Sequence, residues 1–247
     1  MSYRVLGGDC VARLNMLDEE SIDNCITDPP YEIGFMGQGW DNTGVAYNPA
    51  TWRAVHRVLK PNGYMLVFGA TKTHHRIADA IQRAGFEIVD IIAWCYGTGF
   101  PKSHNIGKAV DKLEGQSQWE GWGTALKPAW EPIIVARKKG SQRNVDYSQF
   151  YYIPKPSKSE KNAGLEAFED GKNTHPTVKP VKLMKKLVEE FTEEGSTVLD
   201  PFTGSGTTGM ASVISDRDFI GCELTSEYIP LAKARIGFAQ ENKSFFD

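Results

Sequence analysis

The sequence has 247 residues, of which 40% are hydrophobic and 24% are charged, so it can bury a sizeable core in one large domain or two small ones. This composition excludes an intrinsically disordered chain. The 28 Lys and Arg residues and the 31 Asp and Glu residues give a formal net charge of −3. That charge excludes a protein that coats nucleic acid over its whole surface, although it is compatible with a local basic patch.

The cysteines and the apolar runs indicate the compartment. Cys10, Cys25, Cys95 and Cys222 form no Cys-x-x-Cys pair, which argues against a zinc site and against a secreted disulfide framework. The first residues contain no apolar signal core, and the longest apolar run, at 64–68, is far below the ~20 residues that span a bilayer. We therefore expect a soluble, cytoplasmic protein with no metal site and no membrane contact.

Seven short apolar runs predict β-strands, and they alternate with stretches of helical period. The runs are 3–6, 24–27, 63–68, 86–94, 132–136, 197–199 and 219–223. Four stripes of helical period lie at 52–59, at 77–84, at 181–191 with Pro180 in the first turn, and from Ser226 onward with Lys233 and Arg235 late in the helix. This alternation predicts an α/β fold with a largely parallel sheet, on which the helices bury their apolar faces.

Three segments do not follow this alternation. Residues 32–47, 97–130 and 138–174 show neither the helical nor the strand period. Long irregular segments inside a compact domain are usually functional or mobile, so we expect binding residues or mobile loops in them.

A glycine-rich turn follows the strand predicted at 197–199. Residues 204–209 read Gly-Ser-Gly-Thr-Thr-Gly, which satisfies G-x-G-x-x-G and opens a helix of small residues. Glu223 ends the next strand, 19 residues after Gly204, where a carboxylate can accept hydrogen bonds from both ribose hydroxyls of a nucleoside. The alternative is a tight strand-to-helix turn without a ligand.

The position of this turn predicts a permuted strand order. Only 24 residues of the sequence follow Glu223, so strands from earlier in the chain must complete the sheet. The carboxylate of Asp200 stands just before the glycines, where it would repel a pyrophosphate. It suits a ligand with positive charge, such as the amino and sulfonium groups of S-adenosylmethionine.

A second motif, Asp28-Pro29-Pro30-Tyr31, follows the strand predicted at 24–27. The exocyclic amine of a base is a poor nucleophile, and two acceptors that hold its N–H bonds would favour a pyramidal nitrogen. Asp28 can supply one acceptor and the carbonyl of Pro29 the other. Tyr31, with Phe35 opposite, offers a stacking face worth roughly 1–3 kcal/mol for a base flipped out of a duplex. The alternative is a stiff turn with an incidental tyrosine.

Together these motifs resemble those of the DNA amino-methyltransferases of the bacterial and phage restriction-modification type. Asp28 to Tyr31 is similar to the family's catalytic motif, and 200–209 to its cofactor motif. The stretch 175–180 resembles the element that closes over the methionine end of the cofactor. The catalytic motif precedes the cofactor motif, as in the family's β ordering, which agrees with the permutation.

The resemblance implies a single methyltransferase domain over 1–247. Its fold would be a seven-stranded, mostly parallel Rossmann-like sheet with helices on both faces and a circularly permuted motif order. It also implies direct methyl transfer from S-adenosyl-L-methionine. The residues expected at the cofactor are Asp9, Thr177, Lys179, Asp200, Pro201, Phe202, Gly204, Ser205, Gly206, Thr207 and Glu223.

The middle of the chain carries the positive charge that DNA would need. Residues 135–161 contain seven basic and two acidic side chains, a charge of +5, interleaved with tyrosines. We expect the basic residues to contact DNA, although a solvated loop is the alternative; they are Arg137, Lys138, Lys139, Arg143, Lys155, Lys158 and Lys161. The segments 97–130 and 138–174 are candidate target-recognition insertions. Their small size predicts a short or relaxed target sequence, or a second subunit in a homodimer.

The choice of base and substrate stays open at this point. Adenine N6 is preferred over cytosine N4 because the motif begins with Asp28 rather than Ser, a tendency within the family. Methylation of RNA or of a protein glutamine is a further alternative. So is a non-catalytic DNA-binding or anti-restriction protein that keeps the fold, although the presence of Asp28, Tyr31 and Glu223 argues against it.

Overall fold

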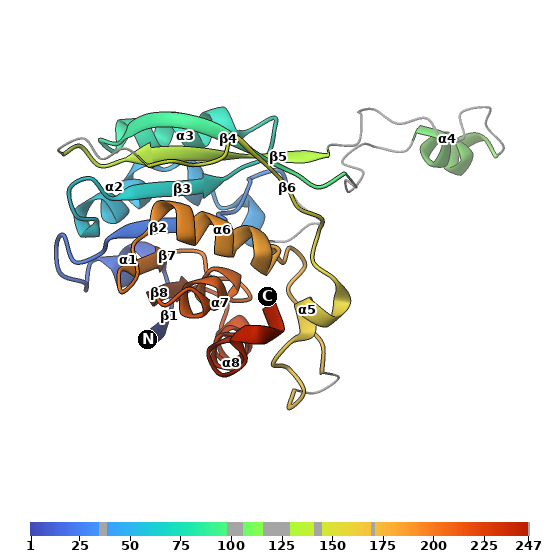
Figure 1. Cartoon of the computed structure of the whole chain (residues 1–247). Coiled ribbons are helices and arrows are strands. Elements are labelled where there is room, and N and C mark those ends of the chain that lie inside the picture. The colour runs from blue at the N-terminus through green and yellow to red at the C-terminus, as the bar shows by residue number, and fades with distance from the viewer. Residues whose placement is uncertain (35–38, 98–105, 116–128, 141–144, 169–170, 247) are drawn as a thin grey trace.

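In the computed structural model of the chain, the described residues are 1–34, 39–97, 106–115, 129–140, 145–168 and 171–246 (Figure 1). Phe35 and Arg143, which the sequence singles out, lie outside the described residues.

The described residues form one eight-stranded sheet, in the order β1-β8-β7-β2-β3-β5-β4-β6. The strands are β1 (Tyr3–Gly7), β2 (Asn24–Thr27), β3 (Tyr64–Phe68), β4 (Glu87–Cys95), β5 (Trp130–Arg137), β6 (Phe150–Tyr152), β7 (Thr197–Asp200) and β8 (Asp218–Glu223). Neighbouring strands are parallel, except that β5 runs antiparallel to β3 and β4. The seven predicted strands are confirmed within two residues at each end. The expected total of seven is too low by one, because the three residues of β6 are too few to show a period.

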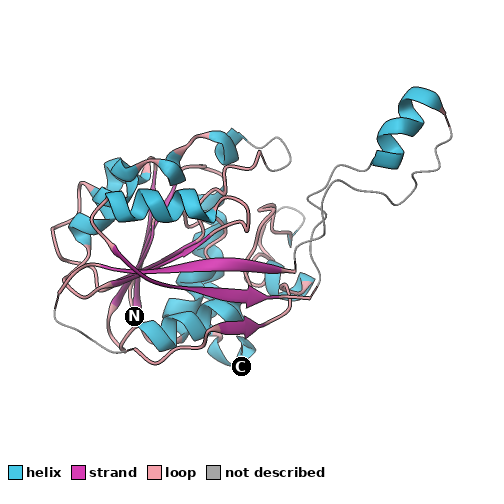
Figure 2. Ribbon diagram, turned by 90° about the horizontal axis from the view of Figure 1, so that it is seen from above, coloured by secondary structure: helices cyan, strands magenta, loops and turns pink. Residues whose placement is uncertain are grey.

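Helices cover both faces of the sheet, as predicted (Figure 1). One face carries α1 (Cys10–Leu14), α2 (Pro49–Val58) and α3 (His74–Arg83); the other carries α6 (Val181–Phe191), α7 (Thr207–Ile214) and α8 (Tyr228–Glu241). Shorter elements are α5 (Lys158–Asn162) and the 3-10 helices η2 (Gly39–Asn42), η3 (Val45–Tyr47) and η5 (Lys243–Phe246). The helix α4 (Ile106–Glu114) stands apart from the sheet (Figure 2). No helix among the described residues has both the length and the apolar character needed to cross a bilayer.

The four predicted helices are present, with small differences at their starts. Pro180 is the N-cap of α6 rather than a residue of its first turn, and α8 begins at Tyr228 rather than at Ser226. Arg235 differs more. The sequence places it late in the helix, in the charge order that the helix dipole favours, but in the structure it lies in the middle of α8 with its side chain fully buried. It points from α8 toward the glycine-rich turn, where its guanidinium donates to Ser205.

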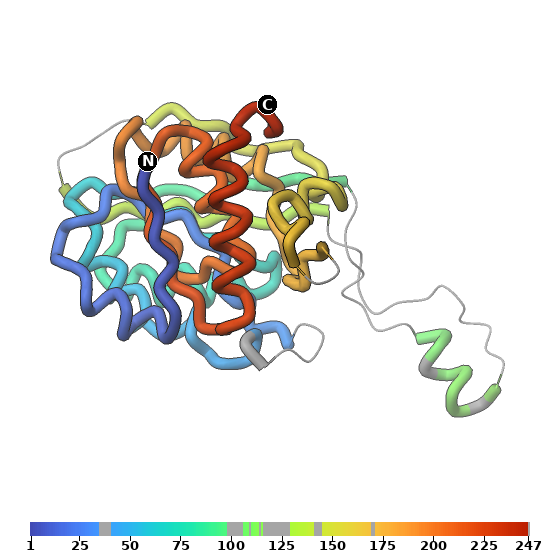
Figure 3. The backbone as a smooth tube through the Cα atoms, turned by 90° about the horizontal axis from the view of Figure 1, so that it is seen from below, coloured from blue at the N-terminus to red at the C-terminus, as the bar shows by residue number. Residues whose placement is uncertain are grey.

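The order of the strands places a crevice between β7 and β2. From β7 the chain passes through α7 to β8 on one side, and from β2 it passes through α2 to β3 on the other. Ligands of open α/β sheets bind where neighbouring strands diverge in this way, outside their carboxyl ends. Because β1 and β8 complete the sheet beside β7, the permuted order is confirmed. Figure 3 shows that α8 runs alongside the N-terminal strand β1.

Gly209 of α7 is packed so tightly that an added methyl group should measurably lower the stability of the fold. A Cβ atom at this position would lie 2.5 Å from Ile236 Cδ1 and 2.8 Å from Phe219 Cε1, both of them core atoms. We expect Gly209→Ala to lower the free energy of unfolding in urea by about 1–3 kcal/mol, because a well-packed core accepts an added methyl only with strain.

Gly237→Ala in α8 is the matched control, since the nearest atom to its Cβ is the Tyr3 hydroxyl at 3.2 Å. There the higher helix propensity of alanine should leave stability unchanged or raise it by up to about 1 kcal/mol. Equal stability of the two variants would contradict the close packing of α7 on β8 and α8.

Candidate active site

A cavity of about 740 Å³ opens at the carboxyl edge of the sheet, in the crevice between β7 and β2. Its volume lies in the range of small-molecule sites. It brings together fourteen residues of the two predicted motif sets: Asp9, Asp28, Pro29, Pro30, Tyr31, Thr177, Lys179, Asp200, Pro201, Phe202, Gly204, Ser205, Thr207 and Glu223. Gly206 is the one described member of the predicted cofactor set that does not line the cavity.

Asp200 ties the two motifs together. Its Oδ1 accepts hydrogen bonds from the Thr27 hydroxyl (2.5 Å) and from the amide of Phe202 (3.0 Å), and its Oδ2 accepts from the Thr208 hydroxyl (2.6 Å). Burial raises the pKa of Asp200 to about 6, although these bonds oppose the shift. The carboxylate expected to face a cationic ligand therefore uses its hydrogen bonds to join β2, β7 and α7.

The glycine-rich turn is shaped by its neighbours. Gly206 caps α7 with a φ of +83°, and a Cβ there would meet the backbone oxygen of Ala232 at 3.0 Å, so only glycine fits without strain. Glu223 Oε2 accepts from the Gly204 amide (2.7 Å), and its Oε1 accepts from the Thr225 amide (2.8 Å). Each carboxylate oxygen keeps a second acceptor position for a ligand hydroxyl.

His175 closes over this turn from the segment before α6. The Cβ of any residue other than glycine at 204 would lie 2.8 Å from His175 Nε2. Burial lowers the pKa of His175 to about 4, and the charges of Lys179 and Arg235 act in the same direction. The ring is thus neutral near pH 7, and it packs edge-on against Tyr228 with 4.7 Å between ring centroids.

Arg235 supports the turn from beneath, a role that the sequence does not predict. Its Nη1 donates to the Ser205 carbonyl (2.7 Å) and hydroxyl (2.9 Å) and to the Thr207 hydroxyl (3.4 Å). Its Nη2 donates to the Glu160 carbonyl (3.4 Å), and the carboxylate of Glu160 accepts from the Val181 amide (2.6 Å). Arg235 therefore links the turn to α5, and the carboxylate of Glu160 links α5 to the start of α6.

Asp28 lies at the end of β2 with its two oxygens in different surroundings. Its Oδ2 is 2.5 Å from the Lys179 Nζ, whereas its Oδ1 is buried and accepts no hydrogen bond from the described residues. Burial raises the pKa of Asp28, and Lys179 opposes this shift. The Lys179 side chain, expected at the cofactor, thus contacts the catalytic motif.

Tyr31 is held at both ends. Its backbone carbonyl accepts from the hydroxyls of Thr73 (3.1 Å) and Tyr47 (3.2 Å), and its own hydroxyl donates to Glu131 Oε2 (2.8 Å). The sequence does not single out Glu131 as a site residue. The only signal is a carboxylate at the start of an apolar strand, which becomes informative once β5 is known to run antiparallel and to begin at this edge.

The loop that follows Tyr31 is fixed by a buried carboxylate. Asp41 accepts hydrogen bonds from the amides of Glu32 (2.9 Å) and Ile33 (3.2 Å), and it lines the cavity. This loop belongs to the irregular segment 32–47, which supports the prediction that the segment contributes to a site. Phe35, the expected second stacking residue, falls outside the described residues.

The predicted basic cluster is divided between the two edges of the sheet. Arg137 ends β5 at the far edge and Lys138 follows it; Arg137 pairs with Glu87 (2.7 Å) and Lys138 with Glu20 (3.1 Å). Lys139 follows them directly. Lys155 and Lys161 instead line the cavity, Lys158 lies with Lys161 on α5, and Arg143 is outside the described residues. The structure therefore does not bring Arg137 and Lys138 to the catalytic motif.

The described part of the chain contains no group of three or more His, Cys, Asp or Glu side chains that could hold a metal ion.

Known proteins are similar to this chain in sequence and in fold over nearly its whole length. The N6/N4 methylase family model, described as DNA methylase, matches residues 22–234. The chain is 33% identical over 254 residues to the DNA adenine methyltransferase YhdJ of Escherichia coli (strain K12), covering 95% of this chain and 83% of that one. It is 25% identical over 258 residues to the type II methyltransferase M2.MboI of Moraxella bovis, covering 95% and 87%.

Solved structures agree with this likeness. The complex of TTHA0409 from Thermus thermophilus with S-adenosyl-L-methionine superposes with a TM-score of 0.63 at 25% identity, covering 97% of this chain and 96% of that one. The cytosine-N4-specific PvuII DNA methyltransferase superposes with a TM-score of 0.72 at 20% identity, covering 100% and 94%, which shows the shared fold.

The buried carboxyl of Asp200 predicts a pH dependence of stability. Its pKa is raised to about 6, so between its ordinary pKa near 4 and about 6 the native state binds more protons than the unfolded state. Stability relative to the neutral Asp200→Asn variant should therefore fall as pH rises through this window, by on the order of 3 kcal/mol. Urea unfolding of both proteins across the window measures the difference.

Asp216→Asn is the control, because Asp216 is exposed and its pKa is lowered by Lys243. Its contribution should change with the opposite sign and be lost as pH falls. A difference between the Asp200 proteins that does not change with pH would contradict the raised pKa.

Proposed function

Because the chain belongs to the N6/N4 DNA methylase family, we propose that it transfers a methyl group from S-adenosyl-L-methionine to the N6 amine of a flipped adenine in double-stranded DNA. The observation that carries this proposal is the state of Asp28. Its Oδ1 is buried in the cavity and accepts no hydrogen bond from the described residues, while its Oδ2 is occupied by Lys179. A buried acceptor that takes no hydrogen bond from these residues can accept one from a substrate N–H.

The residues at the other end of the cavity fit S-adenosyl-L-methionine. Glu223 has acceptor positions left for ribose hydroxyls, and Asp9, one residue beyond Gly8, lies beside it because the Gly8 amide donates to the Glu223 carbonyl (2.8 Å). Thr177 and the neutral His175 line the same cavity near Gly204. When bound there, the cofactor supplies a methyl group on a positively charged sulfur.

The residues of the catalytic motif would prepare the amine for attack. Asp28 Oδ1 accepts one N–H of the exocyclic amine, and we assign the second to the carbonyl of Pro29, which lines the cavity. Two acceptors in fixed positions favour a nitrogen whose lone pair points toward the methyl group. Tyr31 holds the base by stacking, which offsets part of the cost of flipping.

Two observations favour adenine over cytosine. The catalytic motif begins with Asp28, and the relative at 33% identity is a DNA adenine methyltransferase. The cytosine-N4-specific neighbour shares the fold at 20% identity, which carries no information on the base.

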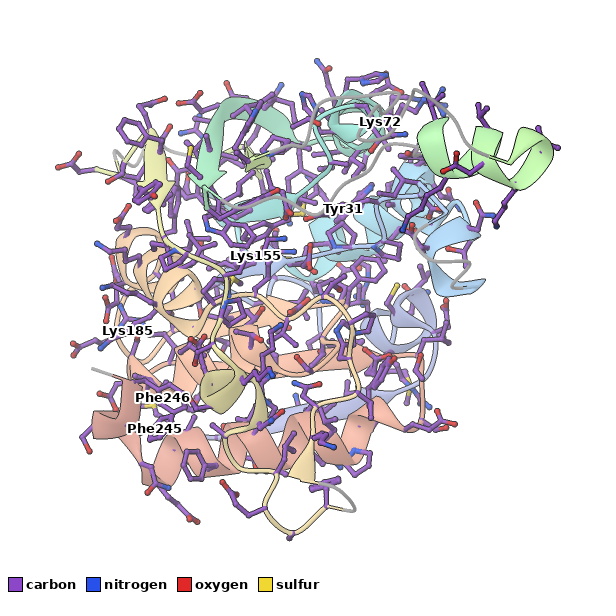
Figure 4. The ribbon with its side chains drawn as sticks, turned by 90° about the vertical axis from the view of Figure 1, so that its right-hand side faces the viewer. Tyr31, Lys72, Lys155, Lys185, Phe245 and Phe246 are labelled. Atoms are coloured by element: carbon purple, nitrogen blue, oxygen red, sulfur yellow. The ribbon has the colours of Figure 1, made fainter. Side chains whose placement is uncertain are left out.

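We propose that the cations at the mouth of the cavity contact the DNA backbone. Lys155 and Lys161 line the cavity, and Lys72 precedes Thr73, whose hydroxyl bonds the Tyr31 carbonyl. Figure 4, which views this edge, shows Lys72, Tyr31 and Lys155 on one side of the molecule. Phosphates flanking a base held at Tyr31 would lie within reach of these ammonium groups.

The first test is methyl transfer to unmethylated double-stranded DNA, with mass spectrometry of the digested nucleosides. We expect N6-methyladenine. We also expect Asp28→Asn to lower the rate of transfer about 100-fold or more, because one acceptor of the amine becomes a donor. Cofactor binding, measured by calorimetry, should survive, since Asp28 contacts the substrate end of the cavity.

The control is Asp79→Asn, which alters an exposed carboxylate on α3 that pairs with Arg83. N4-methylcytosine as the product would overturn the choice of base, and binding of DNA without any transfer would overturn the enzymatic function. Loss of cofactor binding together with transfer in Asp28→Asn would contradict the role assigned to Asp28.

The second test concerns the DNA surface. Replacing Lys72, Lys155 and Lys161 by alanine should weaken DNA binding and make the slope of log K against log salt less steep by about 2–3, as expected for the loss of phosphate contacts. The matched control replaces Lys138 and Lys139, at the far edge of the sheet. A larger change in slope for the control pair would place the DNA on the opposite edge and refute this surface.

A further inference from the structure

Glu131 lies beside the catalytic motif although it is 100 residues away from Tyr31 in sequence. It is buried, its Oε2 accepts from the Tyr31 hydroxyl (2.8 Å), and the same oxygen is 3.5 Å from the Lys179 Nζ. Burial raises the pKa of Tyr96, and the negative charge of Glu131 acts in the same direction. The Glu131 carboxylate therefore accepts from the Tyr31 hydroxyl and attracts the Lys179 ammonium group.

Lys179 is the centre of this cluster. Its Nζ lies 2.5 Å from Asp28 Oδ2 and 3.2 Å from the Tyr31 hydroxyl, and it faces the rings of Phe68, Tyr31 and Trp94 at 5.0, 5.3 and 5.8 Å from their centroids. Aromatic faces attract a cation, and the adjacent carboxylates raise the pKa of Lys179 against the effect of burial. The ammonium group is thus charged and enclosed on several sides.

We propose that Glu131 is a positioning residue for methyl transfer, which acts through Lys179 and the Tyr31 hydroxyl to hold Asp28 with Oδ1 open to the substrate amine. This inference rests on the function proposed above for the same site. Glu131 itself does not touch the reacting atoms.

The geometry gives the reason that a second carboxylate is needed. An ammonium attracted by Asp28 alone could move between both carboxylate oxygens and cover the one that the amine must reach. Glu131 attracts the same ammonium from the side of Tyr31, and the bond between Lys179 and the Tyr31 hydroxyl adds a third attachment. The cation is thereby held at Oδ2, and the Tyr31 ring is fixed as a stacking face.

The same contacts affect the ionisation of Asp28, which must be charged to accept the N–H of the amine. The groups that face it are Lys179, Tyr31, Glu131 and, across the crevice, Asp200. The negative charge of Glu131 raises the pKa of Asp28, while Lys179 and the Tyr31 hydroxyl lower it. Variants of Glu131 and Tyr31 should consequently shift the pH dependence in opposite directions.

The test compares Glu131→Gln with the unaltered chain in methyl transfer to unmethylated double-stranded DNA. We expect kcat to fall about 10- to 100-fold, as for a misplaced reacting group, with the Kd for S-adenosyl-L-methionine unchanged. The acid limb of the pH profile of kcat should move to lower pH, because the loss of one negative charge lowers the pKa of Asp28. Glu131→Asp, which keeps the charge, should retain the position of that limb.

Glu87→Gln is the matched control, since it removes a carboxylate that pairs with Arg137 at the opposite end of β5. It should leave both kcat and the pH profile unchanged. An unchanged kcat in Glu131→Gln would overturn the inference, and so would a lower kcat with the acid limb in its original place, which indicates a merely structural role. Absence of transfer by the unaltered chain would instead overturn the proposed function, and this inference with it.

Tyr31→Phe gives an independent measurement if Glu131→Gln does not fold. It keeps the ring and removes the hydroxyl that bonds Glu131. The loss of that hydroxyl should raise the pKa of Asp28 and move the acid limb to higher pH, opposite to Glu131→Gln. A shift in the same direction in both variants, or no shift in Tyr31→Phe, would overturn the inference.

Discussion

The site depends on the hydrogen bonds that Asp200 accepts from Thr27 and Thr208. Thr27 is the last residue of β2, and Asp28 follows it, so these bonds fix the start of the catalytic motif against the end of β7. The amide of Phe202 adds the start of the glycine-rich turn to the same carboxylate. The buried carboxylate of Asp200 therefore positions both halves of the cavity. It keeps Asp28 at a fixed distance and orientation from the glycine-rich turn.

Buried charge is the second constraint on this site. Arg235, Lys179, Asp200 and Glu131 are all buried, and each is held by hydrogen bonds or ion pairs. Removing such groups from water costs several kcal/mol per ion, and pairing offsets that cost only with good geometry. The same cost lowers the pKa of Arg235 to about 10, because burial disfavours the charged guanidinium. The core around the cavity is thus organised for position as well as for stability.

The sequence predicts those parts of the site that directly follow a predicted strand in the chain. Asp28 and the glycine-rich turn follow predicted strands directly, so their meeting at one edge could be inferred. Glu131 could not, because its place depends on the antiparallel direction of β5. The direction of β5 also explains why the basic cluster is divided. β5 begins beside the cavity at Trp130, and its eight residues, at about 3.3 Å each, carry the chain across the sheet to Arg137 at the far edge. A count of charges along the chain could not reveal that the two ends of the basic cluster lie at opposite edges of the sheet.

The charges at the cavity suit the two ligands of the proposed function differently. Two carboxylates and one ammonium, from Asp28, Glu131 and Lys179, leave one negative charge in excess when all three are ionised. That excess favours a sulfonium and disfavours a phosphate. In the function proposed above, a flipped base would enter the cavity uncharged while its phosphates stay outside, where Lys155 and other cations at the mouth could offset the repulsion. On this proposal, the weak net charge of the chain is compatible with an acidic cavity and a basic rim that would act on different parts of one substrate complex.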